Sequence, residues 1–181
     1  MIEPLDTPRL HLRPLTLADE PRLHPILQDL KVMYAWEHAF SDEEIHEWLL
    51  ENLRRYRTDG YSYMAVETRD NCELAGLSGL LTEHVDGNAI PGIGWIFGER
   101  FWGQGLAQES AKALLSTAFR MPGITRVIAT IRPENTPSIS LAERLGMQQN
   151  GIFTKLYRGK QMPHLIYEIN RDGWHPLSAK Q

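Results

Sequence analysis

The spacing of apolar and polar residues changes from one segment of the chain to the next. Residues 9–14 alternate apolar and polar positions, which predicts a first strand. A helix is then predicted to begin after a cap at Asp19, with Pro21 in its first turn. Its apolar residues recur at helical spacing from Leu23 through Leu30, so this face is expected to be buried.

A second helix has clear start and stop signals. Ser41 and Glu44 have the spacing of a capping box, and apolar residues recur at helical intervals until Gly60. The connector at residues 33–40, between the two helices, is unusually aromatic. It is expected to form either a hydrophobic staple on the second helix or the lip of a binding pocket.

The remaining elements alternate between strands and single helices. Strands are predicted at residues 61–67, 73–81 and 92–97, with a loop at residues 83–91. The order of all the elements predicts one α/β or α+β domain over residues 1–181, with a mixed, mostly antiparallel sheet. The later elements are a helix from Leu106 to Pro122, a strand at 125–131, a short helix from a cap at Thr136 to Gly146, and strands at 153–157 and 164–169.

Composition narrows the function classes. The 181 residues are 42% apolar, which is enough for one core. The net charge is −4 without a lysine or arginine run, so neither nucleic acid nor a membrane is an expected partner. The single Cys72 excludes an internal disulfide and a cysteine-based zinc site, and no metal is expected. Without a signal peptide or an 18-residue apolar segment, the protein is expected to be cytoplasmic.

Two glycines, Gly103 and Gly105, stand one residue apart where the third helix is predicted to begin. Successive backbone N–H groups can converge there and bind phosphate oxygens at the positive end of the helix dipole. The alternative is an ordinary strand-to-helix turn. Gln108 stands where a dinucleotide fingerprint requires a third glycine, and a Gly-Lys-Ser/Thr sequence is absent, so two familiar phosphate loops are excluded.

The sequence Trp-Gly-Gln-Gly-Leu-Ala at residues 102–107 resembles the acetyl-CoA loop of the GNAT N-acetyltransferases, Arg/Gln-x-x-Gly-x-Gly/Ala. Trp102 replaces the leading basic or amide residue, a form similar to the ribosomal-protein N-terminal acetyltransferases of the RimJ/RimL type. Residues 7–14 and 135–146 also look like that branch. The resemblance implies a GNAT-like fold of about seven strands and four main helices, splayed between the fourth and fifth strands.

The resemblance also implies a site for acetyl-CoA as cosubstrate. Its pantetheine arm would pair with the main chain of Trp95, Ile96 and Phe97, whose alternative role is core packing. Asn135 would hydrogen-bond the pantetheine with Ser138 one helical turn on, although both residue types are common at helix starts. The pyrophosphate would bind the backbone amides of Trp102, Gly103, Gln104, Gly105, Leu106 and Ala107.

The implied reaction is attack of a neutral primary amine on the thioester carbonyl, with expulsion of the CoA thiolate. The amine belongs to a peptide N-terminus or to a small molecule such as a polyamine, aminoglycoside or amino acid. Most of the rate would come from alignment and from main-chain N–H groups that polarise the carbonyl. The alternatives are a non-catalytic acyl-CoA-binding module, since Ala142 and Gly92 replace the family's tyrosine acid and the branch's glutamate, and a nucleotide-binding regulator.

Five residues are candidates for acid or base chemistry, and each has the alternative role of an ordinary surface residue. The connector at residues 34–40 and the loop at residues 83–91 are expected to form the walls of the amine site, with a negative, titratable lining that attracts a cationic amine. A monomer or a homodimer is expected. The candidates are Glu83, His84, Glu37, His38 and Ser140.

Overall fold

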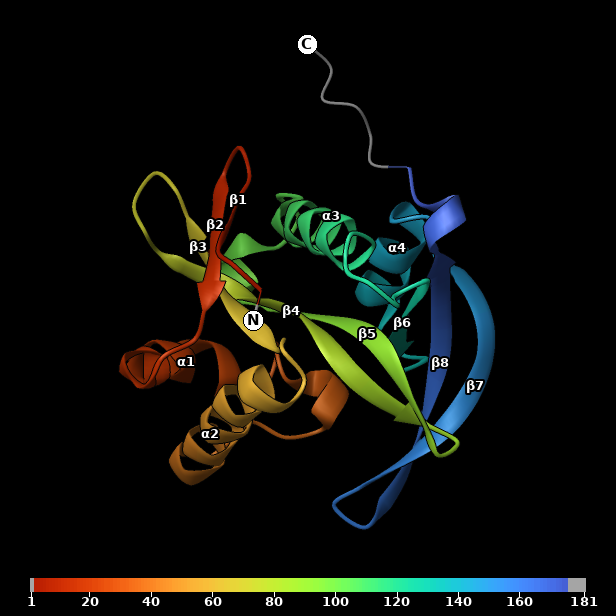
Figure 1. Cartoon of the computed structure of the whole chain (residues 1–181). Helices are drawn as coiled ribbons and strands as arrows, with labels where there is room; N and C mark the ends of the chain where they lie inside the picture. The colour runs from red at the N-terminus through yellow and green to blue at the C-terminus, as the bar shows by residue number, and fades with distance from the viewer. Residues whose placement is uncertain (1, 176–181) are drawn as a thin grey trace.

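The structure, a computed structural model, describes residues 2–175 and is built around one sheet. Within these residues the sheet has eight strands in the order β1-β2-β3-β4-β5-β6-β8-β7 (Figure 1). Every pair of neighbours is antiparallel except β5 and β6. The strands are β1 (Leu5–Asp6), β2 (Leu10–Pro14), β3 (Tyr63–Thr68), β4 (Leu74–Val85), β5 (Asn88–Phe97), β6 (Arg126–Ile131), β7 (Gln148–Tyr157) and β8 (Lys160–Asn170).

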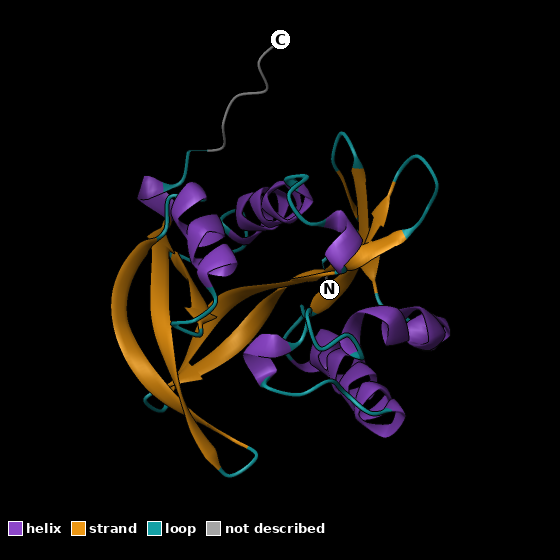
Figure 2. Cartoon of the chain, turned by 180° about the vertical axis from the view of Figure 1, so that it is seen from behind, coloured by secondary structure: helices purple, strands orange, loops and turns teal. Residues whose placement is uncertain are grey.

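Four α-helices cover the two faces of this sheet. Figures 1 and 2 show α3 and α4 together on one face and α1 and α2 on the other. One apolar core accordingly joins the sheet to Leu114 of α3 and Leu141 of α4, and a second joins it to Leu23 of α1 and Leu49 of α2. The helices are α1 (Glu20–Leu27), α2 (Asp42–Thr58), α3 (Leu106–Ala118) and α4 (Thr136–Arg144).

The predicted start of α2 is confirmed, but the predicted end of α1 is wrong. The Ser41 hydroxyl accepts a hydrogen bond from the Glu44 N–H at 3.2 Å, and the Glu44 carboxylate accepts one from the Ser41 N–H at 2.9 Å. By contrast, α1 ends at Leu27, and Leu30 is 64% exposed. The Asp29 carboxylate accepts a hydrogen bond from the Lys31 N–H, a local turn that competes with continuation of the helix.

The prediction of a loop at residues 83–91 is wrong, because these residues form the tip of a hairpin. β4 runs on to Val85 and β5 starts at Asn88. Asp86 and Gly87 have φ values of 49° and 79°, the two left-handed residues of a tight hairpin turn. The extra strand length matters for the site, since it puts consecutive residues of this segment on opposite faces of the sheet.

Three smaller predictions also differ from the structure. The sheet has eight strands rather than about seven, because the two-residue β1 is too short to show a pattern. β7 begins at Gln148 rather than at residue 153, since an irregularity between Gln149 and Ile152 hides the alternation. The cap of α4 is Asn135 rather than Thr136, and its side chain accepts a hydrogen bond from the Ser138 N–H.

The predicted splay lies between β5 and β6. Their ladder joins Gly92 to Ile128, and no other pair of residues in the two strands is in register. Beyond this pair, from Ile93 to Phe97, β5 has no strand beside it on that edge. The main chain of this part of β5 is therefore free to pair with something other than β6. Separately, none of the helices within residues 2–175 has the length and apolarity needed to cross a membrane.

A buried charge cluster ties β2, α1 and β3 together. The Asp19 carboxylate is 2% exposed and accepts hydrogen bonds from the Arg13 guanidinium at 2.6 and 2.8 Å. Glu67 accepts hydrogen bonds from Arg13 at 2.8 and 3.2 Å and pairs with Arg22. Burial alone would raise the pKa of both carboxyls, but the hydrogen bonds outweigh it and each pKa lies below its ordinary value.

We predict from this cluster that stability falls on acidification. A carboxyl with a lowered folded-state pKa stabilises the fold above its unfolded pKa, here 3.8 for Asp19 and 4.5 for Glu67, and this contribution is lost as the pH falls below those values. Asp19→Asn should cost roughly 1–3 kcal/mol at pH 7 and flatten the acid slope of the melting temperature. Thermal denaturation followed by circular dichroism from pH 7 to 3 tests this, and an unchanged slope in the variant would contradict it.

Candidate active site

A groove of about 940 Å³ lies along the splayed part of β5. It runs from the glycine loop at the start of α3 to the start of α4. Two cations, Lys31 and Arg144, stand at its walls, and Lys31 also forms an ion pair with Glu99 at 2.9 Å. Its other walls are Val32, Tyr34, Trp36, Trp95, Ile96, Phe97, Phe101, Trp102, Gly103, Gly105, Leu106, Ala107, Gln108, Asn135, Pro137, Ser138 and Leu141.

The glycine loop is open at the helix N-terminus. Gly103 and Gly105 have φ values of 73° and 76°, where a side chain would be strained. Within residues 2–175, none of the backbone N–H groups from residue 103 to residue 108 donates a hydrogen bond to a backbone or side-chain acceptor. The loop therefore offers a row of free donors at the positive end of the 13-residue α3.

The N-terminal segment holds this loop in place. The Arg9 guanidinium donates to the Gln104 carbonyl at 2.9 Å and to the Glu109 carboxylate at 2.7 Å, and the Thr7 hydroxyl donates to Glu109 at 2.6 Å. Burial raises the pKa of Glu109, but the hydrogen bonds from Thr7 and Arg9 outweigh it and keep this carboxyl below its ordinary pKa. Thr7 and Arg9 thus fix the start of α3, a role that the sequence did not predict.

The splayed strand presents mainly its backbone to the groove. The side chains of Ile96 and Phe97 are buried in the two different cores. The Trp102 indole, 46% exposed, donates to the Phe97 carbonyl at 2.7 Å, so the protein itself uses that acceptor. The Trp95 ring is half-buried and lies between this groove and a second cavity.

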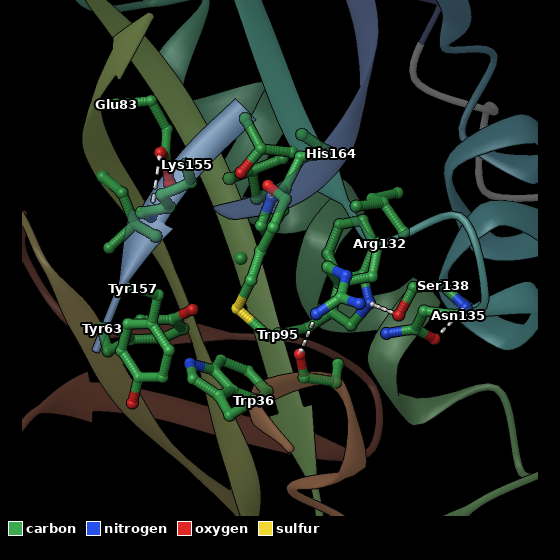
Figure 3. Close-up of a pocket in the computed structure, with 18 of the residues that line it drawn as sticks. Trp36, Tyr63, Glu83, Trp95, Arg132, Asn135, Ser138, Lys155, Tyr157 and His164 are labelled. Atoms are coloured by element: carbon green, nitrogen blue, oxygen red, sulfur yellow. Dashed lines mark hydrogen bonds and ion pairs between the residues drawn. The ribbon is translucent and has the colours of Figure 1, made fainter. Parts of the chain in front are cut away.

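The second cavity has a volume of about 240 Å³ and meets the groove at four shared residues: Trp36, Trp95, Asn135 and Ser138. Figure 3 shows Trp95 at its centre, with Tyr63, Tyr157 and Trp36 on one side and Arg132 and Ser138 on the other. The rest of its lining is Ala35, Trp48, Arg55, Leu81, Glu83, Ile93, Gly94, Ala129, Thr130, Ile131, Lys155, Met162 and His164.

Two glycines of β5 make room for polar groups in this cavity. A Cβ on Gly92 would lie 2.6 Å from the Cγ of Glu83, and one on Gly94 would overlap the hydroxyl oxygen of Tyr63. Residues two apart share one face of a strand and are about 7 Å apart. The Tyr63 hydroxyl, which reaches across β4 from β3, and the Glu83 side chain of β4 therefore lie over two positions on the same face of β5.

The environment keeps the Tyr63 hydroxyl protonated. Burial raises its pKa first, and the negative charge of Glu83 raises it further. The Glu83 carboxylate lies 3.8 Å from the Lys155 ammonium and is 16% exposed. The lining of the cavity thus includes a neutral hydroxyl and a carboxylate.

Side chains at the junction of the two cavities form hydrogen bonds with residues at the start of α4. The Asn135 side-chain oxygen accepts from the Ser138 N–H at 3.1 Å and from the Tyr34 hydroxyl at 2.6 Å. The Ser138 hydroxyl oxygen accepts from the Trp95 indole at 3.1 Å, which leaves its own hydrogen free. Ala142, one turn further on, is fully buried in the core and faces neither cavity.

Of the five predicted acid and base candidates, only Glu83 lines the second cavity. His84 follows it in β4 and is exposed on the other side of the strand. Glu37 forms ion pairs with Arg132 at 3.1 Å and with Lys160. The other two, His38, which pairs with Glu44 at 3.2 Å, and Ser140, are half-buried and line neither cavity.

The charge of this cavity is the opposite of the negative lining expected for the amine site. Arg55, Arg132 and Lys155 line it, against the single carboxylate of Glu83. Burial lowers the pKa of His164, so this imidazole is neutral at pH 7. The sequence did not single out any of these four basic residues. Its hints of the cavity were Glu83, the aromatic connector that contains Trp36, and the pair of glycines in β5, since glycine within a strand marks a close approach.

Comparisons with known proteins agree with this geometry. A family model described as Acetyltransferase (GNAT) domain matches residues 9–148. The uncharacterized N-acetyltransferase YnaD of Bacillus subtilis (strain 168) is 30% identical over 174 residues, which cover 94% of this chain and 99% of that protein.

Solved structures agree in fold. The acetyltransferase (GNAT family) from Bacillus anthracis has a TM-score of 0.79 at 26% identity and covers 93% of this chain and 99% of its own. The RimL ribosomal L7/L12 alpha-N-protein acetyltransferase in complex with coenzyme A has a TM-score of 0.76 at 22% identity, with coverage of 94% and 99%. The family match, the curated relative and the shared fold lead to one conclusion: the chain belongs to the GNAT family of N-acetyltransferases.

Proposed function

We propose that this chain is a single-domain enzyme of the RimJ/RimL-like branch that transfers the acetyl group of acetyl-CoA to a primary amine. The amine belongs to a peptide N-terminus or to a small molecule. The observation that carries the proposal is the meeting of the groove and the second cavity at Trp95 and Ser138. Two substrates held in these spaces would approach each other at that junction, as direct transfer requires.

The groove suits the chemistry of acetyl-CoA. The free amides of the glycine loop match the pyrophosphate, and Lys31 and Arg144 add positive charge along the walls. The unpaired edge of β5 beyond Gly92 offers main-chain groups to the amides of a pantetheine arm. When bound, acetyl-CoA supplies the thioester. The coenzyme A complex of RimL, a structural neighbour, supports this assignment.

We assign the proton transfers to groups around the junction. The amine lone pair attacks the thioester carbon, the carbon–sulfur bond breaks, and the amine proton passes to the Glu83 carboxylate. The neutral Tyr63 hydroxyl, which occupies the space left by the missing side chain of Gly94, orients the amine. The free hydrogen of the Ser138 hydroxyl faces the junction and is available to the leaving sulfur.

The competing proposal is a non-catalytic acyl-CoA-binding module. Its support is Ala142, which replaces the family's tyrosine, and Gly92, which replaces the branch's glutamate. Two observations favour the enzyme instead. Ala142 faces the core rather than the groove, and the Glu83 side chain fills the space that a side chain at Gly92 would occupy. Release of free CoA thiol from acetyl-CoA in the presence of a panel of amines distinguishes the two.

The glycine loop generates the first prediction. Gly105→Val adds a branched side chain at the helix start and should weaken CoA binding at least tenfold, measured by isothermal titration calorimetry. Gly123→Val is the matched control, since Gly123 has a φ of 82°, open space around it and no part in either cavity. Equal CoA affinity in the two folded variants would rule out the loop as the pyrophosphate site.

The second prediction separates the two roles of Asn135. Asn135→Ala removes the α4 cap and should cost about 1 kcal/mol of stability. Asn135→Asp keeps a capping oxygen but replaces the amide donor with a second carboxylate oxygen and a negative charge. The Asp variant should therefore keep the wild-type melting temperature while the KM for acetyl-CoA rises. Full activity in Asn135→Asp would show that the residue serves the helix alone.

The third prediction uses two adjacent residues of β4. Glu83→Gln should lower kcat/KM about a hundredfold and remove the limb of the pH profile that depends on this carboxylate. His84→Ala, on the opposite face, should leave kcat/KM within twofold. Steady-state assays of thiol release across pH 6–9 measure both variants. Similar small effects at both positions would exclude Glu83 as the base.

A further inference from the structure

The second cavity has a charge that a general amine site does not need. A cationic amine is repelled by neighbouring cations, yet Arg55, Arg132 and Lys155 all line this space. Only Glu83 opposes them there. Each cation can bind an anionic ligand only if its own hydrogen bonds and ion pairs within the protein leave donors free.

Arg132 is bound mainly by other groups of the protein, although its buried Nε has no hydrogen-bond partner within residues 2–175. It is buried, donates to the Ala35 carbonyl and to the Glu37 and Glu134 carboxylates, and joins the end of β6 to the aromatic connector. Its role is that of a brace between these segments. Two carboxylates, Glu37 and Glu134, oppose its charge, so it is less available to a ligand than Arg55 or Lys155.

Arg55 and Lys155 are less occupied. The Arg55 Nε donates to Glu51 at 2.9 Å, and its two terminal nitrogens form no hydrogen bond within residues 2–175. The Lys155 ammonium lies 3.8 Å from Glu83, too far for a hydrogen bond, and its side chain is 49% exposed. Both therefore have donors available to an anionic group in the cavity.

His164 also lines this space. Burial lowers its pKa most, the hydrogen bond with the Met162 carbonyl raises it, and Lys155 and Arg132 lower it further against Glu83. The neutral imidazole adds no positive charge of its own. The lining therefore has three cations, Arg55, Arg132 and Lys155, and one carboxylate, Glu83.

We infer that the acceptor is an amine that also carries a negatively charged group, held by Lys155 and Arg55 while the amine lies beside Trp95. This inference rests on the proposed acetyl transfer. Carboxylates on free amino acids and on acidic peptide N-termini share this chemistry. Polycations such as polyamines and aminoglycosides do not fit it.

The size of the cavity agrees with a compact acceptor. Its volume of about 240 Å³ is roughly a quarter of the 940 Å³ of the groove. That space suits an amine with one short acidic substituent. The rings of Trp36, Trp48 and Tyr63 close it on one side with apolar surface.

Charge-matched acceptors test the inference. We would compare kcat/KM for 4-aminobutyrate, 4-aminobutanamide and 1,4-diaminobutane, and separately for glycyl-aspartyl, glycyl-asparaginyl and glycyl-lysyl amides. The first set holds the chain length nearly constant and changes only the charge. In the second set the aspartyl and asparaginyl members match in size, and the lysyl member has a longer side chain. The acidic member should exceed the cationic member at least tenfold in one set or in both, and the set with the larger ratio identifies a free acid or a peptide as the source.

Variants assign the preference to the cavity. Lys155→Met and Arg55→Met should each reduce the ratio of acidic to neutral acceptor several-fold, chiefly through the KM for the acidic acceptor. The KM for acetyl-CoA should not change. Lys112→Met, on α3 and outside both cavities, is the matched control and should keep the wild-type ratio.

Each result decides between the proposals. Equal or higher activity on the cationic members would overturn the inference and leave acetyl transfer intact. A preference for the acidic acceptor that survives in Lys155→Met and Arg55→Met would also overturn the inference, because other residues would then bind the negatively charged group. Failure to release thiol with every acceptor, while acetyl-CoA still binds, would overturn the proposed enzyme and this inference with it.

Discussion

The separation of β5 from β6 is the constraint on which the rest of the structure depends. Neighbouring parallel strands ordinarily share a continuous ladder, but these two pair only through Gly92 and Ile128. Unpaired backbone groups in a protein interior are costly, so the exposed edge of β5 requires water or a ligand. The groove and the second cavity both open at this edge, and Trp95 stands between them. The N-terminal residues Thr7 and Arg9, which hold the glycine loop through Glu109, matter because they fix one end of the same opening.

Most of the fold could be predicted because its signals are local. The capping box at Ser41 and the glycine at residue 105 each act within a few residues, so sequence alone identifies the helices that they start. The wrongly predicted elements are those whose sequence signal is only one or two residues long. Asp86-Gly87 is a strong two-residue hairpin turn, but Gly87 and Pro91 together suggested a loop. β1 has two residues and depends entirely on its pairing with β2, which no pattern within it reveals.

The two parts of the candidate site also differ in how far the sequence could predict them. The glycine loop is one continuous stretch, and the resemblance to a known family covers it residue by residue. The second cavity collects Arg55 from α2, Tyr63 from β3, Lys155 from β7 and His164 from β8, which only the sheet order brings together. Since β8 inserts between β6 and β7, the last strands reach the cavity by a pairing that sequence order does not imply. A count of charged residues along the chain therefore could not predict that the lining of the cavity has a net positive charge.

The sign of the cavity also bears on how the reaction can proceed with so few acid and base groups. An ammonium among cations loses its proton more readily than one in water, so the base that we propose, Glu83, does not have to be strong. The absence of a tyrosine at Ala142 is then a matter of packing, because that position lies in the core beneath α4. What the site supplies instead is placement, with glycines in β5 that admit the Tyr63 hydroxyl and the Glu83 side chain beside the splayed strand. This arrangement can accelerate the reaction by aligning the substrates and by its electrostatic field, rather than through a strong base.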